Sequence, residues 1–262
     1  MQFIDIGANL THESFQKDLN DVLTRAKTQS VKQMIVTGAS PQGSLDAIAL
    51  AEQYPQLYAT CGVHPHEATL WNDDIQQQHT ALCKNPTVVA IGECGLDYNR
   101  DFSPRDKQRY AFEAQLNIAC EIEKPLFLHQ RDAHDDFHTI LQKYRADIAD
   151  VVVHCFTGEQ HEMQAYIDLD CYIGITGWIC DERRGFHLRE FIHQIPADRL
   201  MIETDAPYLL PRDIRPKPKT RRNEPQWLPH IAQVIASCLE KPVEQLADEV
   251  YRNSLHFFRL TT

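Results

Sequence analysis

The sequence VVAIGECGLD at residues 88–97 carries the acid Glu93 directly after an apolar, β-rich run. A carboxylate in a buried strand is unfavourable by roughly several kcal/mol unless a positive group pairs with it or it coordinates a cation. Glu93 is therefore either half of a structural ion pair or a metal ligand. Residues that follow other apolar runs distinguish these two interpretations.

Three further residues that can bind metals also follow apolar runs. His129 follows PLFL, His154 follows VVV and Asp205 follows LMIET. A site assembled from such distant residues requires a fold that returns every run to one rim, and a (β/α)8 barrel does so with the C-terminal ends of its strands. The pattern therefore favours metal ligation by Glu93 over a structural ion pair.

Strand and helix patterns alternate along the chain, which indicates a parallel sheet. Eight β-rich apolar runs lie at residues 2–7, 33–38, 57–63, 87–92, 125–129, 151–155, 171–176 and 199–204. An open doubly wound sheet would also alternate, but it gathers its ligands at one switch point, whereas these candidates follow several runs. We therefore expect an α/β fold with one (β/α)8 TIM barrel, and residues 1–262 as a single domain.

Composition is that of a globular protein, with 43% hydrophobic and 24% charged residues. No apolar run approaches the roughly 20 residues of a membrane helix, and the first residues lack signal-peptide features. We expect a cytoplasmic monomer without membrane association. The cysteines lack CxxC spacing, which favours reduced thiols over disulfides. They are residues 61, 83, 94, 120, 155, 171, 180 and 238.

A basic segment, LLPRDIRPKPKTRRNEP at residues 209–225, follows the last predicted strand. It holds six basic and two acidic residues in a chain with a formal net charge of −11. The overall charge argues against indiscriminate binding of nucleic acid, so any phosphate must be attracted locally. Although most charge runs are simply solvated, the position beside Asp205 favours a phosphate clamp that includes Arg221 and Arg222.

Glu93, His129 and His154 form a ligand set for a divalent ion that leaves positions open for water and substrate. Asp205 can ligate, act as a base or do both, and an Asx turn is the alternative. His64, in GVHPH after the third run, is expected near the metal or a phosphate. The chain has no GxSxG elbow, P-loop or recognisable Cys-His pair, so hydrolysis by a metal-activated water is favoured over covalent catalysis.

Eight ordered motifs closely resemble those of TatD-type deoxyribonucleases, and the match spans essentially the whole chain. They are DIGANL, GVHPHE, AIGECGLD, HQRDAH, HCFTG, IGITGW, ETDAPYLLP and RRNEP. The resemblance implies an amidohydrolase-like, metal-dependent barrel with 3′-to-5′ exonuclease action on single-stranded DNA and RNA, and DNA repair as the expected process. Mg²⁺ is the expected cofactor, with Mn²⁺ or Zn²⁺ as alternatives.

The resemblance also implies roles for individual residues. Glu93, His129 and His154 correspond to metal ligands, Asp205 to a catalytic or ligating acid, and His64 to an active-site residue. Arg131, in HQRDAH, is predicted to contact substrate. Stacking on single-stranded bases would need aromatic side chains at the rim. The candidates are Tyr98, Phe102, Phe156, Trp178 and Tyr208.

One departure concerns the first strand. Many members of the wider group have Asp-x-His-x-His there, whereas this chain has Gly7 and Asn9 at the two histidine positions. A second metal is therefore expected to be weaker, absent or held by other residues. The alternative function is that of an ester or amide hydrolase, such as an aminoacyl-tRNA deacylase. Amide hydrolases of this superfamily usually depend on the strand-one histidine pair, so its absence favours the nuclease.

Overall fold

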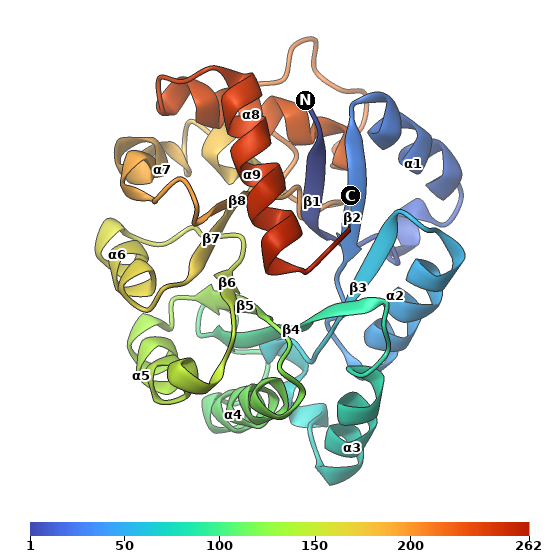
Figure 1. The fold of residues 1–262 in the computed structure, drawn as a ribbon, viewed down its shortest axis with the longest axis vertical. Helices are drawn as coiled ribbons and strands as arrows, with labels where there is room; N and C mark the ends of the chain where they lie inside the picture. Colours follow the sequence, from blue (N-terminus) through green and yellow to red (C-terminus); the bar gives the residue numbers. More distant parts are fainter. Residues whose placement is uncertain (262) are drawn as a thin grey trace.

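Eight strands, each parallel to the next in chain order, form the sheet of the computed structural model, which describes residues 1–261 (Figure 1). The strands are β1 (Phe3–Ala8), β2 (Val31–Val36), β3 (Leu57–Cys61), β4 (Val88–Asp97), β5 (Leu126–Arg131), β6 (Val151–Val153), β7 (Tyr172–Ile175) and β8 (Leu200–Ile202). A parallel bridge between Ala8 and Ala206 joins the end of β1 to the segment after β8. The predicted TIM barrel is confirmed.

Helices surround the strands (Figure 1). They are α1 (Leu19–Thr28), α2 (Pro41–Gln53), α3 (Asp73–Leu82), α4 (Arg105–Ile122), α5 (His134–Tyr144), α6 (Gln160–Asp168), α7 (Phe186–Phe191), α8 (Leu228–Cys238) and α9 (Val243–Phe257). Short 3-10 helices are η1 (Glu13–Phe15), η2 (Pro65–Leu70), η3 (Arg145–Asp147), η4 (Gly177–Cys180), η5 (Ile192–Gln194) and η6 (Pro225–Trp227). Within residues 1–261, none of the helices combines the length and the apolar character needed to cross a membrane.

Helix α9 closes one end of the barrel, and it crosses in front of the strands in Figure 1. Its Phe257 packs with Phe258 into a buried cluster that contains Ile4 of β1 and Val89 of β4, both near the starts of their strands. Asn253 of α9 donates to the Leu200 carbonyl at the start of β8, at 2.8 Å. The N-terminal end of the barrel is therefore filled, and a binding site is left to the opposite rim.

An irregularity in β4 turns Glu93 toward the barrel interior. In a regular strand, residues 91 and 93 would lie on one face of the sheet and residue 94 on the other. Here Ile91 and Cys94 instead both pack in the layer between sheet and helices, so Glu93 lies on the opposite face. The pairing register with β5 shifts between Ile91 and Cys94, as in a β-bulge. Gly92 adopts φ +137°, and a Cβ there would lie 2.0 Å from the Phe127 carbonyl oxygen, so only glycine fits this turn of the strand.

All eight cysteines are free thiols, as the spacing predicted. Five of them are buried, and three are partly exposed. Buried thiols behave as small apolar side chains in a packed core. The barrel is therefore held together without disulfides.

Asp5 is a buried carboxyl that links β1 to the segment after β8. Its Oδ1 accepts from the Thr204 amide at 2.9 Å, and its Oδ2 lies 2.5 Å from the Thr204 hydroxyl. Burial, with a contribution from Glu203, raises the pKa of Asp5 from 3.8 to about 8 despite these hydrogen bonds. Asp5 therefore keeps its proton in the folded protein near neutral pH.

Asp5→Asn is expected to gain stability relative to the parent protein as pH rises. The folded pKa lies above the unfolded one, so the contribution of Asp5 is complete below pH 3.8 and is lost as pH rises toward 8. Asn preserves the shape and does not titrate, so the difference in unfolding free energy should change by about 2–5 kcal/mol across this window. Urea unfolding of both proteins at several pH values measures it, and two parallel stability curves would contradict the assignment.

Candidate metal centre

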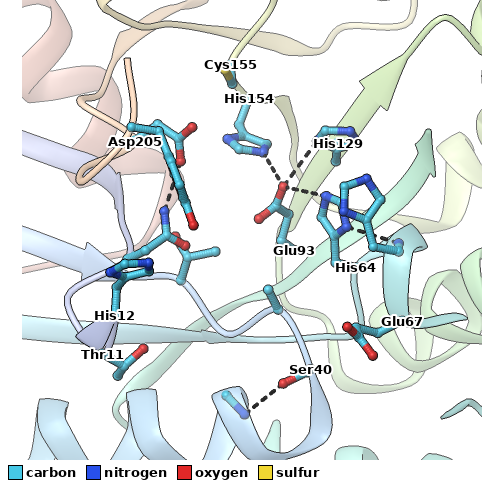
Figure 2. A pocket seen from close by; sticks show the side chains of 16 residues that line it. Thr11, His12, Ser40, His64, Glu67, Glu93, His129, His154, Cys155 and Asp205 are labelled. Atoms are coloured by element: carbon cyan, nitrogen blue, oxygen red, sulfur yellow. Dashed lines mark hydrogen bonds and ion pairs between the residues drawn. The ribbon is translucent and has the colours of Figure 1, made fainter. Parts of the chain in front are cut away.

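A cavity of about 460 Å³ opens among the C-terminal ends of the strands. It is lined by all five of the residues predicted to bind metal or act in catalysis (Figure 2). Glu93 lies on β4, His129 on β5, His154 just after β6, His64 at the N-cap of η2 and Asp205 three residues after β8. The strand-end rule thus brings together residues that are far apart in sequence.

Glu93 lies at the centre of three imidazoles (Figure 2). Its Oε1 is 2.9 Å from Nε2 of His154, 3.1 Å from Nδ1 of His129 and 3.3 Å from Nε2 of His64. One carboxylate oxygen and three ring nitrogens therefore converge on a small volume at the base of the cavity.

The charges in this cluster depend on one another. Burial alone would raise the pKa of Glu93, but His64 and His154 hold it well below its ordinary value, so Glu93 is ionised. Burial likewise opposes protonation of His154, yet Glu203 and Glu93 raise the pKa of His154 well above its ordinary value. Burial lowers the pKa of His64 to about 4, which keeps that imidazole neutral and able to ligate. Without a cation, the ionised Glu93 is thus paired with a protonated His154, and ligation of a metal ion by His154 would release that proton.

The donor set fits a divalent cation. Ligand atoms of His64, Glu93 and His129 all lie within 4.8 Å of one another, and His154 contacts the same Glu93 oxygen. A carboxylate with imidazoles is a common set for Zn²⁺ and Mn²⁺, and the carboxylate is also suited to Mg²⁺.

Asp205 faces the Glu93 cluster across the cavity (Figure 2). Its Oδ1 accepts from the Asn9 side-chain amide at 3.0 Å. Burial raises the pKa of Asp205 to about 7, and the nearby Glu93 and Glu203 act in the same direction, while His154 opposes them. Asp205 is therefore a fixed carboxyl group that can exchange a proton near neutral pH.

A second layer of carboxylates orients the histidines, and the sequence reasoning did not identify it. Asp97 Oδ2 lies 3.2 Å from Nε2 of His129 and 2.8 Å from Nε2 of His66. Glu203 Oε2 lies 3.3 Å from Nδ1 of His154. Carboxylates in such positions fix the orientation of a ligating ring and increase its basicity. Asp97 ends the motif AIGECGLD, and Glu203 begins the motif ETDAPYLLP. A second acid at the end of the same strand is therefore the sequence feature that could have identified each of them.

Glu203 also explains the departure in β1. A Cβ built on Gly7 would lie 2.3 Å from Oε2 of Glu203 and 3.0 Å from the ring of Phe127. No side chain larger than hydrogen fits there while Glu203 keeps its place. At position 7, where many relatives have a histidine, the space beside the backbone is thus filled by the Glu203 carboxylate. At the second histidine position, Asn9 binds Asp205.

Comparison with known proteins identifies the family. A family model described as TatD related DNase matches residues 4–259. The chain belongs to the TatD related DNase family. The resemblance inferred from the eight motifs is confirmed, and with it the prediction of a hydrolytic nuclease.

Individual relatives agree with that membership. The chain is similar to a protein of Rahnella sp. (strain Y9602) named 3′-5′ ssDNA/RNA exonuclease TatD, at 50% identity over 98% of each chain. A Salmonella typhimurium protein of the same name is 52% identical over 88% of this chain and 89% of its own. Among solved structures, the TatD homolog YJJV from Escherichia coli K12 superposes with a TM-score of 0.91 at 27% identity, covering 99% of this chain and 98% of that one.

The two arginines that were predicted to contact substrate in the basic segment have different surroundings. Arg222 has a guanidinium bound by Asp18 and Glu224, each at 2.7 Å, and its side chain is only 19% exposed. It therefore ties the basic segment to the N-terminal region, and its contact with a phosphate stays a prediction. Arg221 is exposed, and it lines a separate pocket together with Lys217 and Lys219, so its phosphate contact stays a prediction.

Arg131 and the aromatic candidates occupy different surroundings. Arg131 donates to the Thr157 hydroxyl at 2.8 Å and lies over the ring of Trp178, outside the residues that line the cavity. Its role in substrate binding stays a prediction. Phe156 is buried and cannot stack on a base, whereas Tyr208 is 52% exposed and lines the cavity. Tyr208 is thus the best placed of the aromatic candidates.

Arg222→Ala is expected to change the stability of the protein, and Arg221→Ala is expected to change its binding of single-stranded DNA. The first removes both ion pairs and leaves the buried Glu224 with Arg25 alone, so the free energy of unfolding should fall by about 1–3 kcal/mol. The second should leave stability unchanged and flatten the salt dependence of single-stranded DNA binding, because a phosphate contact releases a counterion. Urea unfolding and binding titrations at several salt concentrations measure both effects. An unchanged salt slope for Arg221→Ala would remove the clamp.

Proposed function

We propose that this chain is a metal-dependent 3′-to-5′ exonuclease that hydrolyses phosphodiester bonds of single-stranded DNA and RNA. One observation carries the proposal: the Glu93 cluster and Asp205 face each other across an open cavity, in a chain about half identical to proteins named for this activity. A cytoplasmic, monomeric enzyme of DNA repair remains a prediction from the sequence.

Glu93, His129 and His154, with His64 beside them, would hold the divalent cation, and we propose Mg²⁺, with Mn²⁺ or Zn²⁺ as alternatives. When bound, the cation supplies Lewis acidity and lowers the pKa of a coordinated water. Asp97 and Glu203 keep the rings of His129 and His154 in position through the contacts described above. The protein therefore holds its ligands in place before substrate arrives.

Asp205 is proposed to accept the proton of the attacking water. It lines the cavity opposite Glu93, its Asn9 contact fixes one carboxylate oxygen, and its pKa near 7 is suited to proton transfer at neutral pH. A bound cation would lower that pKa and favour the ionised form. The same acids repel phosphate when no cation is present, so activity should depend strictly on metal.

Digestion of 5′-end-labelled single-stranded DNA with Mg²⁺ tests the function directly. A ladder that shortens from the 3′ end and disappears with EDTA is the expected result, and a single-stranded RNA of the same sequence should behave alike. A 3′-end label distinguishes direction, because exonuclease action from that end releases it as a mononucleotide at once. Absence of cleavage with both Mg²⁺ and Mn²⁺ would contradict the proposal.

The alternative of an ester or amide hydrolase, such as an aminoacyl-tRNA deacylase, finds no support in the site. Such enzymes of this superfamily are expected to use the strand-one histidine pair. Here the space beside Gly7 is filled by Glu203, and Asn9 is engaged with Asp205.

A further inference from the structure

A second group of metal-binding side chains lies outside the catalytic cavity. Cys180 ends η4, Asp213 belongs to the basic segment 209–225, and His230 lies in the first turn of α8. Sulfur, carboxylate and imidazole ligand atoms of these three residues all lie within 4.8 Å of one another. Nε2 of His230 is 2.7 Å from Oδ1 of Asp213. None of the three lines the catalytic cavity.

The exposure of these residues matches a site that an ion can enter from solvent. The side chains of Asp213 and His230 are 34% and 31% exposed, whereas Cys180 is fully buried beneath them. An Asp–His hydrogen bond would account for two of these residues, and a buried thiol packed as an apolar group for the third. The Cys180 sulfur lies within 4.8 Å of the ligand atoms of both residues, and a thiol hydrogen bond to Asp213 is the alternative explanation of its position. Because tetrahedral Zn²⁺ has bonds of about 2.0–2.3 Å, its ligand atoms lie about 3.3–3.7 Å apart. Binding would therefore draw the sulfur in by up to about 1 Å and move His230 and Asp213 apart from their present 2.7 Å.

We propose that Cys180, Asp213 and His230 form a second metal site that binds a thiophilic divalent ion of the Zn²⁺ class, with water in the fourth position. Soft thiolate and imidazole select Zn²⁺ over Mg²⁺, so this site and the catalytic centre would prefer different ions. Burial raises the pKa of the Cys180 thiol, which therefore stays protonated without a cation. Binding forms the metal–sulfur bond and releases the thiol proton to solvent.

The site would anchor the basic segment to the barrel. Of the three proposed ligands, Asp213 belongs to the basic segment, where it lies between Arg212 and the buried Ile214. The other two, Cys180 and His230, belong to η4 and α8. A bound ion would thus fix the start of the segment that later carries Arg221. The inference rests on these three residues and does not depend on the proposed exonuclease activity.

Cobalt absorption tests the site independently of turnover. The full chain, stripped of metal with a chelator, is titrated with Co²⁺ in a reducing buffer. A near-ultraviolet thiolate-to-cobalt charge-transfer band is expected, and Zn²⁺ should abolish it. The catalytic histidines and Glu93 produce no such band because they contain no sulfur. Absence of the band in the parent protein would overturn the proposal.

Two cysteine variants locate the sulfur. Cys180→Ser should lose the band. Cys155→Ser is the control, because Cys155 is a thiol of the catalytic cavity and not a ligand of the proposed site, so this variant should retain the band. Loss of the band in Cys155→Ser alone would assign the sulfur to the catalytic centre and overturn the site. Since Cys180 is buried and its replacement could disturb folding, His230→Gln provides a second variant on a partly exposed residue. It should keep the native circular dichroism and weaken Co²⁺ binding by about tenfold or more; unchanged affinity would exclude His230 as a ligand.

Discussion

Glu93→Gln is expected to lower kcat on single-stranded DNA by about three orders of magnitude or more, equivalent to about 4 kcal/mol of transition-state stabilisation. Oε1 of Glu93 is the single atom on which His64, His129 and His154 converge. Gln preserves the size of the side chain but removes the negative charge, so cation binding is lost even though Asp97 and Glu203 still hold the rings of His129 and His154. The catalytic centre would then lack its central ligand.

Turnover of end-labelled DNA over a range of Mg²⁺ concentrations measures this effect. Glu67→Gln is a matched control, because Glu67 is an exposed carboxylate that lines the same cavity. It should retain activity close to that of the parent protein. Circular dichroism shows whether each variant is folded. If folded Glu93→Gln kept activity within about tenfold of the parent protein, Glu93 would not be a ligand of the catalytic ion.

Asp205→Asn is expected to lower kcat by about 10²–10⁴-fold while leaving the protein folded. A general base must be ionised, so the activity of the parent protein should rise with pH through the pKa of Asp205 and then level off. The pKa is about 7 in the protein without metal, and a bound cation would move the rise to lower pH. Asn cannot ionise, so the acidic limb should disappear from the residual activity.

Rate profiles of kcat against pH at saturating Mg²⁺ measure this limb. Asn9→Ala provides an intermediate case, because it removes a hydrogen bond that lowers the pKa of Asp205. Its acidic limb should therefore move to higher pH, with only a modest loss of maximal rate. An acidic limb that persists unchanged in Asp205→Asn would assign the ionisation to another group.

The sequence by itself determined the barrel and the residues at its rim. Alternation of apolar runs with helical patterns is a local property, and parallel strands must all point the same way, so the sequence alone predicts that Glu93, His129, His154 and Asp205 share one rim. The thiols and the approximate positions of the strands followed from equally local patterns. The strand positions and the state of the thiols depend on residues that are close together in the chain, and those residues can be read directly from the sequence.

Only the tertiary structure decided how distant groups share space. Asp97 and Glu203 acquire their roles because they meet His129 and His154 from other strands, and Gly7 is small because the carboxylate of Glu203 fills the adjacent volume. Arg222 looked like any basic residue of its segment until its contacts with Asp18 and Glu224 were visible. Charge, hydrogen bonding and packing act over a few ångströms in space, and a linear sequence does not state which distant side chains come within that range.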